Sequence, residues 1–135
     1  MSKGVKIEDK ASSRVATIDK EYKNKKGFSG FEHIKRFKGD SLSPKMVEKT
    51  ADFFSRPIDL IFIDTIHDYK NTKKNIIFYG RKLNPRYIIL DDTHLNPSME
   101  KLWTELKEKF KGRIFDVTKI GERGKAGMGI IKWRK

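Results

Sequence analysis

Apolar and polar positions alternate along this chain in blocks that predict strands and helices in turn. Two apolar runs of strand length, residues 58–63 and 86–91, each end at carboxylates. The first run is apolar on both faces, which predicts a central parallel strand covered by helices on both sides. Shorter strands are predicted at residues 15–18, ending at Asp19, and at residues 34–37.

Between these strands, apolar residues recur at helical spacing. Helices are predicted from Ser43 to about Phe54, over residues 68–83, and from Asn96 through Lys111, where Gly112 closes the last helix. The third helix is predicted to bury the apolar residues Met99, Leu102, Trp103, Leu106 and Phe110.

The end of the chain predicts two more strands, near residues 113–118 and 127–133, spaced as an antiparallel pair at a sheet edge. The glycine-rich stretch 121–125 is predicted as the loop between them, and the polar stretch 20–32 as a short helix and loop. Strands and helices that alternate in this way predict an α/β fold with a doubly wound, mostly parallel sheet. The length of 135 residues fits a single domain over residues 1–135.

Composition narrows the class of protein. The hydrophobic content of 36% is below the usual ~45–50% and predicts a modest core. The absence of cysteine excludes disulfides and thiolate metal sites. No apolar run approaches the ~20 residues that cross a bilayer, and the N-terminus has no signal-peptide core. We therefore expect a cytoplasmic protein without a membrane partner.

The formal net charge of +13 is the strongest compositional signal for a partner. A charge of this sign and size is typical of proteins that bind nucleic acid or another polyanion. However, lysines far outnumber arginines and are spread along the whole chain, which is equally typical of general lysine enrichment. The densest run, Lys20 to Lys26, fits a solvated loop or helix, so both interpretations stay open.

The candidate chemistry lies at Asp64, Asp91 and Asp92, which follow the two long apolar runs. The carboxyl ends of parallel strands meet at one crevice, where α/β proteins bind ligands. Carboxylate oxygens are the ligands that Mg²⁺ prefers. The alternative is that these acids cap the helices that follow. The adjacent pair Asp91 and Asp92 favours a site, because two neighbouring acids repel unless positive charge lies near them.

Histidines add to this group. His67 follows Asp64 by three residues and is predicted to point into the same crevice, where an imidazole can act as a base near neutral pH. The alternative is a structural histidine hydrogen-bonded to Asp64 or Asp68. His94 is a weaker candidate for substrate contact, and His33 is predicted to be structural or exposed.

Two other strand ends carry polar residues, namely Asp19 and the turn Gly39-Asp40-Ser41. An acid at the end of a strand in such a sheet is well placed to accept hydrogen bonds from ribose hydroxyls. A polar turn after the next strand can contact an adenine edge.

The ordered set of these motifs resembles class I S-adenosylmethionine-dependent methyltransferases, and in particular the cation-dependent O-methyltransferases and the cephalosporin-hydroxylase-like group. The resemblance runs from about Arg14 to the C-terminus. Five segments carry it: Val-Ala-Thr-Ile-Asp (15–19), Phe-Lys-Gly-Asp-Ser (37–41), Asp-Leu-Ile-Phe-Ile-Asp (59–64), Ile-Ile-Leu-Asp-Asp (88–92) and Gly-Met-Gly-Ile-Ile-Lys-Trp (127–133).

This resemblance implies a Rossmann-like fold and methyl transfer to an oxygen of a small hydroxylated substrate. It implies that S-adenosylmethionine is bound by Asp19, Asp40, Ser41 and Asp64. It also implies that Mg²⁺ or another divalent cation is bound by Asp64, Asp91 and Asp92. Catalysis is assigned to His67 with Asp64, since the family often places a base, commonly lysine, three residues after that aspartate.

One element of the family pattern is missing. Such enzymes begin with a strand that runs into a Gly-rich turn near the methionine part of the cofactor, and only 13 residues precede Arg14. We expect a truncated sheet that lacks its usual first strand, with a homodimer or another partner covering the open edge. Two alternatives stay open: a non-catalytic basic protein associated with RNA, and a metal-dependent phosphodiesterase or nuclease.

Overall fold

The computed structural model describes residues 13–21, 33–54, 56–118 and 126–135. The loop predicted at residues 121–125 and nearly all of the stretch predicted at 20–32 lie outside the described residues. The chain divides into two compact units, residues 1–55 and 56–135. The single domain over residues 1–135 stays a prediction. In the part of the chain that the structure describes, no helix is long and apolar enough to cross a membrane.

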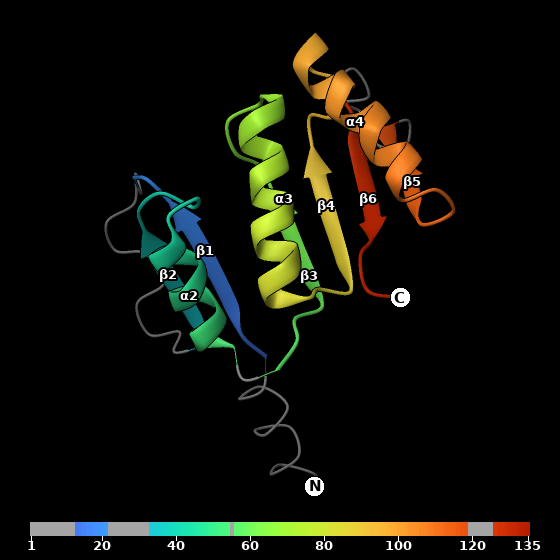
Figure 1. The fold of residues 1–135 in the computed structure, drawn as a ribbon. Helices are drawn as coiled ribbons and strands as arrows, with labels where there is room; N and C mark the ends of the chain where they lie inside the picture. The colour runs from blue at the N-terminus through green and yellow to red at the C-terminus, as the bar shows by residue number, and fades with distance from the viewer. Residues whose placement is uncertain (1–12, 22–32, 55, 119–125) are drawn as a thin grey trace, which may run out of the picture. The chain divides into compact units, whose positions relative to one another are not determined.

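In its described residues, the first unit contains a small parallel sheet and the helix α2 (Figure 1). Strands β1 (Val15–Asp19) and β2 (Ile34–Lys38) pair in parallel, with Asp19 opposite Lys38 at their carboxyl ends. Helix α2 (Pro44–Phe53) begins with the proline that the sequence places at the first helical position. Its buried residues are Met46, Val47 and Thr50.

Over residues 56–118 and 126–135, the second unit contains a four-stranded sheet and two helices (Figure 1). Its elements are β3 (Leu60–Ile63), α3 (Tyr69–Leu83), β4 (Tyr87–Asp91), α4 (Pro97–Lys109), β5 (Ile114–Asp116) and β6 (Met128–Lys132). The strand order is β3-β4-β6-β5. Strand β3 is parallel to β4, while β6 is antiparallel to both β4 and β5. The antiparallel pair at the end of the chain and the α/β fold class are thus confirmed.

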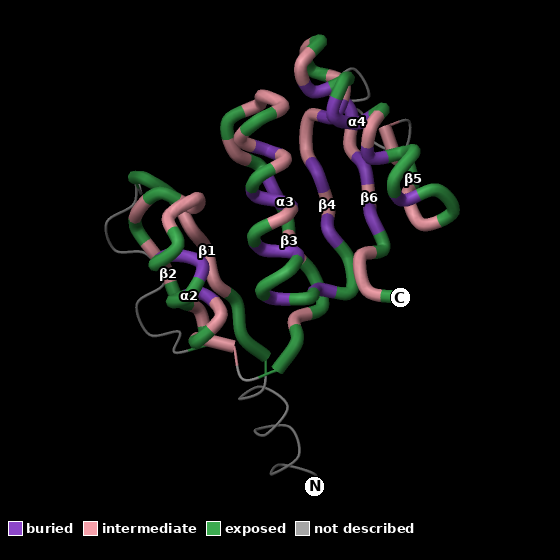
Figure 2. Tube along the Cα trace, in the orientation of Figure 1, coloured by how far each residue is buried: buried purple, intermediate pink, exposed green. Residues whose placement is uncertain are grey.

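The core of this unit lies between the sheet and the two helices, which both cover the same face. Figure 2 shows buried positions along β4 and β6 and on the helices. Ile88 and Ile131 are fully buried at adjacent positions of β4 and β6. All five residues predicted to be buried along the third helix are buried. The buried cluster consists of Ile63, Ile76, Ile88, Leu90, Leu102, Trp103, Leu106, Phe110 and Ile131.

The predicted burial of the first apolar run on both faces is wrong. Leu60 and Phe62 are each 52% exposed, whereas Ile63 is buried. The cause is that α3 and α4 pack on the face that contains Ile61 and Ile63, so the alternate residues point to the uncovered face. In addition, β3 is an edge strand of its sheet and not a central one.

Strands β1 and β3 belong to separate sheets in the described part of the chain. Residues 1–12 lie outside the described residues, so the expected loss of the usual first strand stays a prediction. Helix α4 ends at Lys109, two residues before the predicted end, and Gly112 follows with a φ of 84°. A positive φ suits glycine, so Gly112 forms the turn that leads into β5.

Candidate metal centre

The parallel pairing of β3 and β4 determines where the candidate residues lie. Ile63 is opposite Leu90, so the chain leaves both strands at the same edge of the sheet. Asp64 follows β3 directly, Asp91 is the last residue of β4, and Asp92 follows it. The predicted convergence of these strand ends is therefore present in the second unit.

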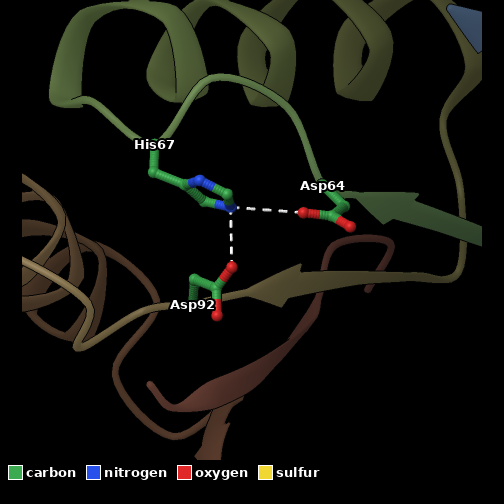
Figure 3. Close-up of side chains that lie close together, drawn as sticks. All are labelled: Asp64, His67 and Asp92. Atoms are coloured by element: carbon green, nitrogen blue, oxygen red, sulfur yellow. Dashed lines mark hydrogen bonds and ion pairs between the residues drawn. The ribbon is translucent and has the colours of Figure 1, made fainter.

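Asp64, His67 and Asp92 form a close group at this edge (Figure 3). The Nε2 atom of His67 lies 2.7 Å from Oδ2 of Asp92 and 3.2 Å from Oδ1 of Asp64. One ligand atom from each residue lies within 4.8 Å of the others, which is the spacing of ligands around a single metal ion. The side chains are 48%, 32% and 21% exposed for Asp64, His67 and Asp92, so a cation from solvent can reach them.

Asp92 turns the chain out of β4 with an unusual backbone conformation. Its φ is 55°, in the left-handed region that aspartate and asparagine tolerate better than most residues. Its N–H donates to the carbonyl of Gly127 at 2.9 Å, and its carbonyl accepts from Leu95 at 3.2 Å. These bonds fix the turn that presents the Asp92 carboxylate to His67.

Asn96 holds the loop that carries His67. The side-chain Nδ2 of Asn96 donates to the carbonyl of His67 at 3.0 Å, while its Oδ1 accepts from Met99 N at 2.9 Å and caps α4. A second link runs from the Tyr69 N–H to Oγ of Ser98 at 2.7 Å. The loop after β3 and the loop after β4 are thus joined at the beginning of α4.

Other residues cap the two helices. Capping was the alternative role for the acids at the strand ends. Asp68 caps α3, because its Oδ1 accepts from Asn71 N at 2.7 Å. This hydrogen bond is the main cause that lowers the pKa of Asp68. With Asp68 capping α3 and Asn96 capping α4, the carboxylates of Asp64 and Asp92 face His67.

Asp91 lies at the end of β4, next to Asp92 of this group. Its Oδ1 accepts from the N–H of Asp92 at 3.0 Å. Burial raises the pKa of the Asp91 carboxyl, and the charges of Asp92 and Asp64 raise it further. A cation in the group would oppose this effect by offsetting the negative charge. The role of Asp91 as a metal ligand stays a prediction.

His94 belongs to a different cluster. Its Nε2 lies 2.9 Å from Oδ2 of Asp116, its Nδ1 lies 3.6 Å from Glu100, and its ring meets Trp103 edge to face. Burial raises the pKa of Asp116, but hydrogen bonds from Thr118 and His94 outweigh it and lower that pKa to about 2. The sequence did not identify Asp116, which is 22 residues from His94.

The predicted cofactor residues are divided between the two units. Asp19 ends β1, and its carbonyl accepts from the N–H of Gly39 at 2.8 Å. The Oδ1 of Asp40 accepts from Leu42 N at 2.9 Å, which shapes the turn that contains Ser41. These three residues share the carboxyl edge of the small sheet, while Asp64 lies in the second unit. Their role in binding S-adenosylmethionine stays a prediction.

The donor set of the group fits a divalent cation. Two carboxylates and one imidazole supply oxygen and nitrogen ligands without thiolates, which suits Mg²⁺ or Mn²⁺ better than soft metals. Three protein ligands leave coordination positions for water or a substrate oxygen. One lone pair on Nε2 of His67 can serve either as a third ligand of the cation or as a base beside it; in the second case the two carboxylates alone hold the cation.

Comparison with known proteins supports the class of fold. No family model matches the sequence, and no curated protein is similar to it. The described geometry is that of a Rossmann-like methyltransferase fold. Two solved structures of the MycE methyltransferase from the mycinamycin biosynthetic pathway are similar, each with a TM-score of 0.61, at 13% and 11% sequence identity.

The likeness covers 88% of this chain and 36% of the MycE chain, so this chain spans about a third of the length of MycE. One MycE structure is a complex with Mg and SAH, and the other is a complex with Mg, SAH and mycinamycin VI. At this identity the likeness shows the fold alone.

Proposed function

We propose that this chain takes part in S-adenosylmethionine-dependent O-methylation of a small hydroxylated substrate, with a divalent cation. The observation that carries the proposal is the group of Asp64, His67 and Asp92 at the carboxyl edge of the sheet. The fold adds support, because MycE has a similar fold and was solved with Mg and SAH.

Each acidic residue has a defined part in this proposal. Asp64 and Asp92 hold the cation with their carboxylates, and Asp91 adds negative charge beside them. The cation, when bound, lowers the pKa of a substrate hydroxyl, while S-adenosylmethionine supplies the methyl group.

His67 accepts the proton of the substrate hydroxyl at Nε2. The imidazolium that results lies 2.7 Å from Asp92 and 3.2 Å from Asp64, so both carboxylates stabilise its charge. Asn96 fixes the backbone of His67 through its carbonyl, which keeps the ring at this position. Catalysis then depends mainly on holding the reacting atoms in line.

Calorimetric titration of the full chain tests the proposal. S-adenosylmethionine is titrated with and without Mg²⁺, and Mn²⁺ is titrated alone. We expect saturable binding of both, because the acidic group attracts the cation and α/β proteins bind ligands at the carboxyl ends of their parallel strands. If neither S-adenosylmethionine nor Mn²⁺ binds, the proposal is wrong.

A pair of variants on one strand locates the cation. Asp64→Asn removes a carboxylate from the group at the carboxyl end of β3, and we expect roughly tenfold or weaker Mn²⁺ binding. Asp59→Asn makes the same change to an exposed residue near the amino end of that strand and should leave the affinity unchanged. Equal Mn²⁺ affinity in the two variants would rule out the assigned site.

A further inference from the structure

The four-stranded sheet has an apolar face opposite α3 and α4 on which no helix among the described residues of the second unit packs, and which we call the open face. The register of the strands places its residues side by side, since Phe62 is opposite Ile89, Ile89 is opposite Ile130, and Phe115 is opposite Ile130. The face is formed by Leu60, Phe62, Tyr87, Ile89, Phe115, Met128 and Ile130.

The exposure of this face is unusual for a single polypeptide in water. Leu60, Phe62 and Phe115 are each 52% exposed, and Tyr87 is 37% exposed. Scattered exposed apolar residues are normal, but these are contiguous on three strands and surround the half-buried Ile89 and Ile130. A contiguous apolar patch of this kind marks a surface that another layer covers.

Charges at the two ends of the open face indicate which layer fits it. Asp91 lies at one end of β4, opposite Met128, while Lys132 lies at the other end of the face, opposite Tyr87. The face therefore has an apolar centre, one acidic end and one basic end. Such a surface is complementary to a copy of itself when the strand directions are reversed.

We propose that the open face is the interface of a homodimer, with the sheets of two copies packed face to face. The two-fold axis lies between the sheets and runs across the strands, so that Lys132 of each copy faces the acidic end of the other. An axis along the strands would instead place acidic end against acidic end. A two-fold contact of this kind uses the same patch on both copies, and sheets pack in this manner in β-sandwiches.

The size of the face determines how strong the dimer is. The four strands have three to five residues each and cover at most roughly 19 Å by 16 Å from standard strand spacing and rise. Side chains project from the sheet and add to this flat area. Two such faces therefore bury on the order of 1,000 Å² in total, which is at the low end of specific interfaces. We therefore expect a dimer with a dissociation constant in the micromolar range, populated as the concentration rises.

Sedimentation velocity of the full chain over a wide concentration range tests this interface. We expect the wild type to pass from monomer to dimer. Phe62→Lys places a charge in the open face and should raise the dissociation constant more than tenfold, because the ammonium would have to leave water. Phe78→Lys is the matched control, since Phe78 is 39% exposed on α3, outside the open face.

A second pair of variants tests the direction of the two-fold axis. Lys132→Glu places like charges opposite each other and should weaken the dimer severalfold, whereas Lys109→Glu at the end of α4 should not. Circular dichroism shows which variants are folded. If Phe62→Lys does not fold, the effect of Lys132→Glu on the dissociation constant of the dimer tests the interface. A wild type that stays monomeric at all concentrations overturns the proposal. A dimer whose dissociation constant is the same in the wild type, Phe62→Lys and Lys132→Glu overturns it as well.

Discussion

Asp92 combines a strained backbone with a place in the candidate metal centre. Its φ of 55° is rare for a residue with a side chain, yet aspartate tolerates it because its short polar side chain can bond locally. Strained residues often occur at functional sites. The position thus limits which substitutions can separate the role of the charge from that of the backbone.

Two substitutions at Asp92 separate these roles. Both Asp92→Asn and Asp92→Ala remove the charge near His67, but only asparagine tolerates the left-handed conformation. We expect Asp92→Ala to be less stable than Asp92→Asn by about 1 kcal/mol. Urea denaturation of both variants measures the difference in the free energy of unfolding. Equal stability would show that the turn at residue 92 relaxes without strain.

The residues of the group were predictable because backbone topology brings them together. Asp64 and Asp92 follow parallel strands, so their convergence follows from the fold class alone. The contact between His94 and Asp116 and the hydrogen bond from Asn96 to His67 were not predictable. Both depend on the conformations of the loops after β3 and β4, which a single sequence does not encode locally.

At the scale of elements, the beginning of α4 is also part of the site. Asn96 caps the helix with its Oδ1 and holds the carbonyl of His67 with its Nδ2. The beginning of α2 differs, because Ser43 makes no capping hydrogen bond with its side chain. The two helix starts therefore form a natural comparison.

Alanine substitutions at the two positions test this difference. Asn96→Ala removes a cap and one further hydrogen bond, so we expect a loss of about 2 kcal/mol in stability. Ser43→Ala should change stability by less than about 0.5 kcal/mol, because no capping bond is lost. Thermal and urea denaturation measure both effects. A loss at Ser43 as large as that at Asn96 would contradict the assigned caps.

The elements themselves were largely predictable, and their surroundings less so. Helical spacing located the buried residues of α4, including Leu102 and Trp103. The apolar run that contains Leu60 and Phe62 indicated a strand correctly, but its burial was predicted wrongly. An apolar run shows that both faces of a strand favour burial, yet it does not show whether the chain supplies a layer for each.

At the scale of the whole molecule, burial is distributed unequally between the two units. In the described part of residues 1–55, the buried residues are Met46, Val47 and Thr50. The second unit contains the large cluster around Ile88 and Ile131. Regions with few buried apolar contacts open at a lower free energy than well-packed ones.

Hydrogen exchange of the full chain measures this inequality. We expect the backbone amides of β1 and β2 to exchange at least about tenfold faster than those of β4 and β6, which corresponds to a difference of ~1.4 kcal/mol or more in opening free energy. Mass spectrometry of peptic fragments resolves the strands. Similar protection of all four strands would mean that the two units unfold as one.

The net charge of +13 is the remaining signal at this scale. The nucleic-acid alternative stays a prediction, and its signature is an affinity that falls steeply with salt.

The two short loops that join a strand to a helix in the second unit have an evolutionary consequence. Residues 64–68 and 92–96 carry the candidate chemistry, yet each short loop is anchored by a strand before it and a capped helix after it. The packed cluster around Ile88 lies in the layer between sheet and helices, away from these loops. Mutation can therefore replace residues of both loops, other than the caps Asp68 and Asn96 and the buried Thr93, while the scaffold persists. The seven other positions of residues 64–68 and 92–96 are where new reactivity can be grafted onto this framework.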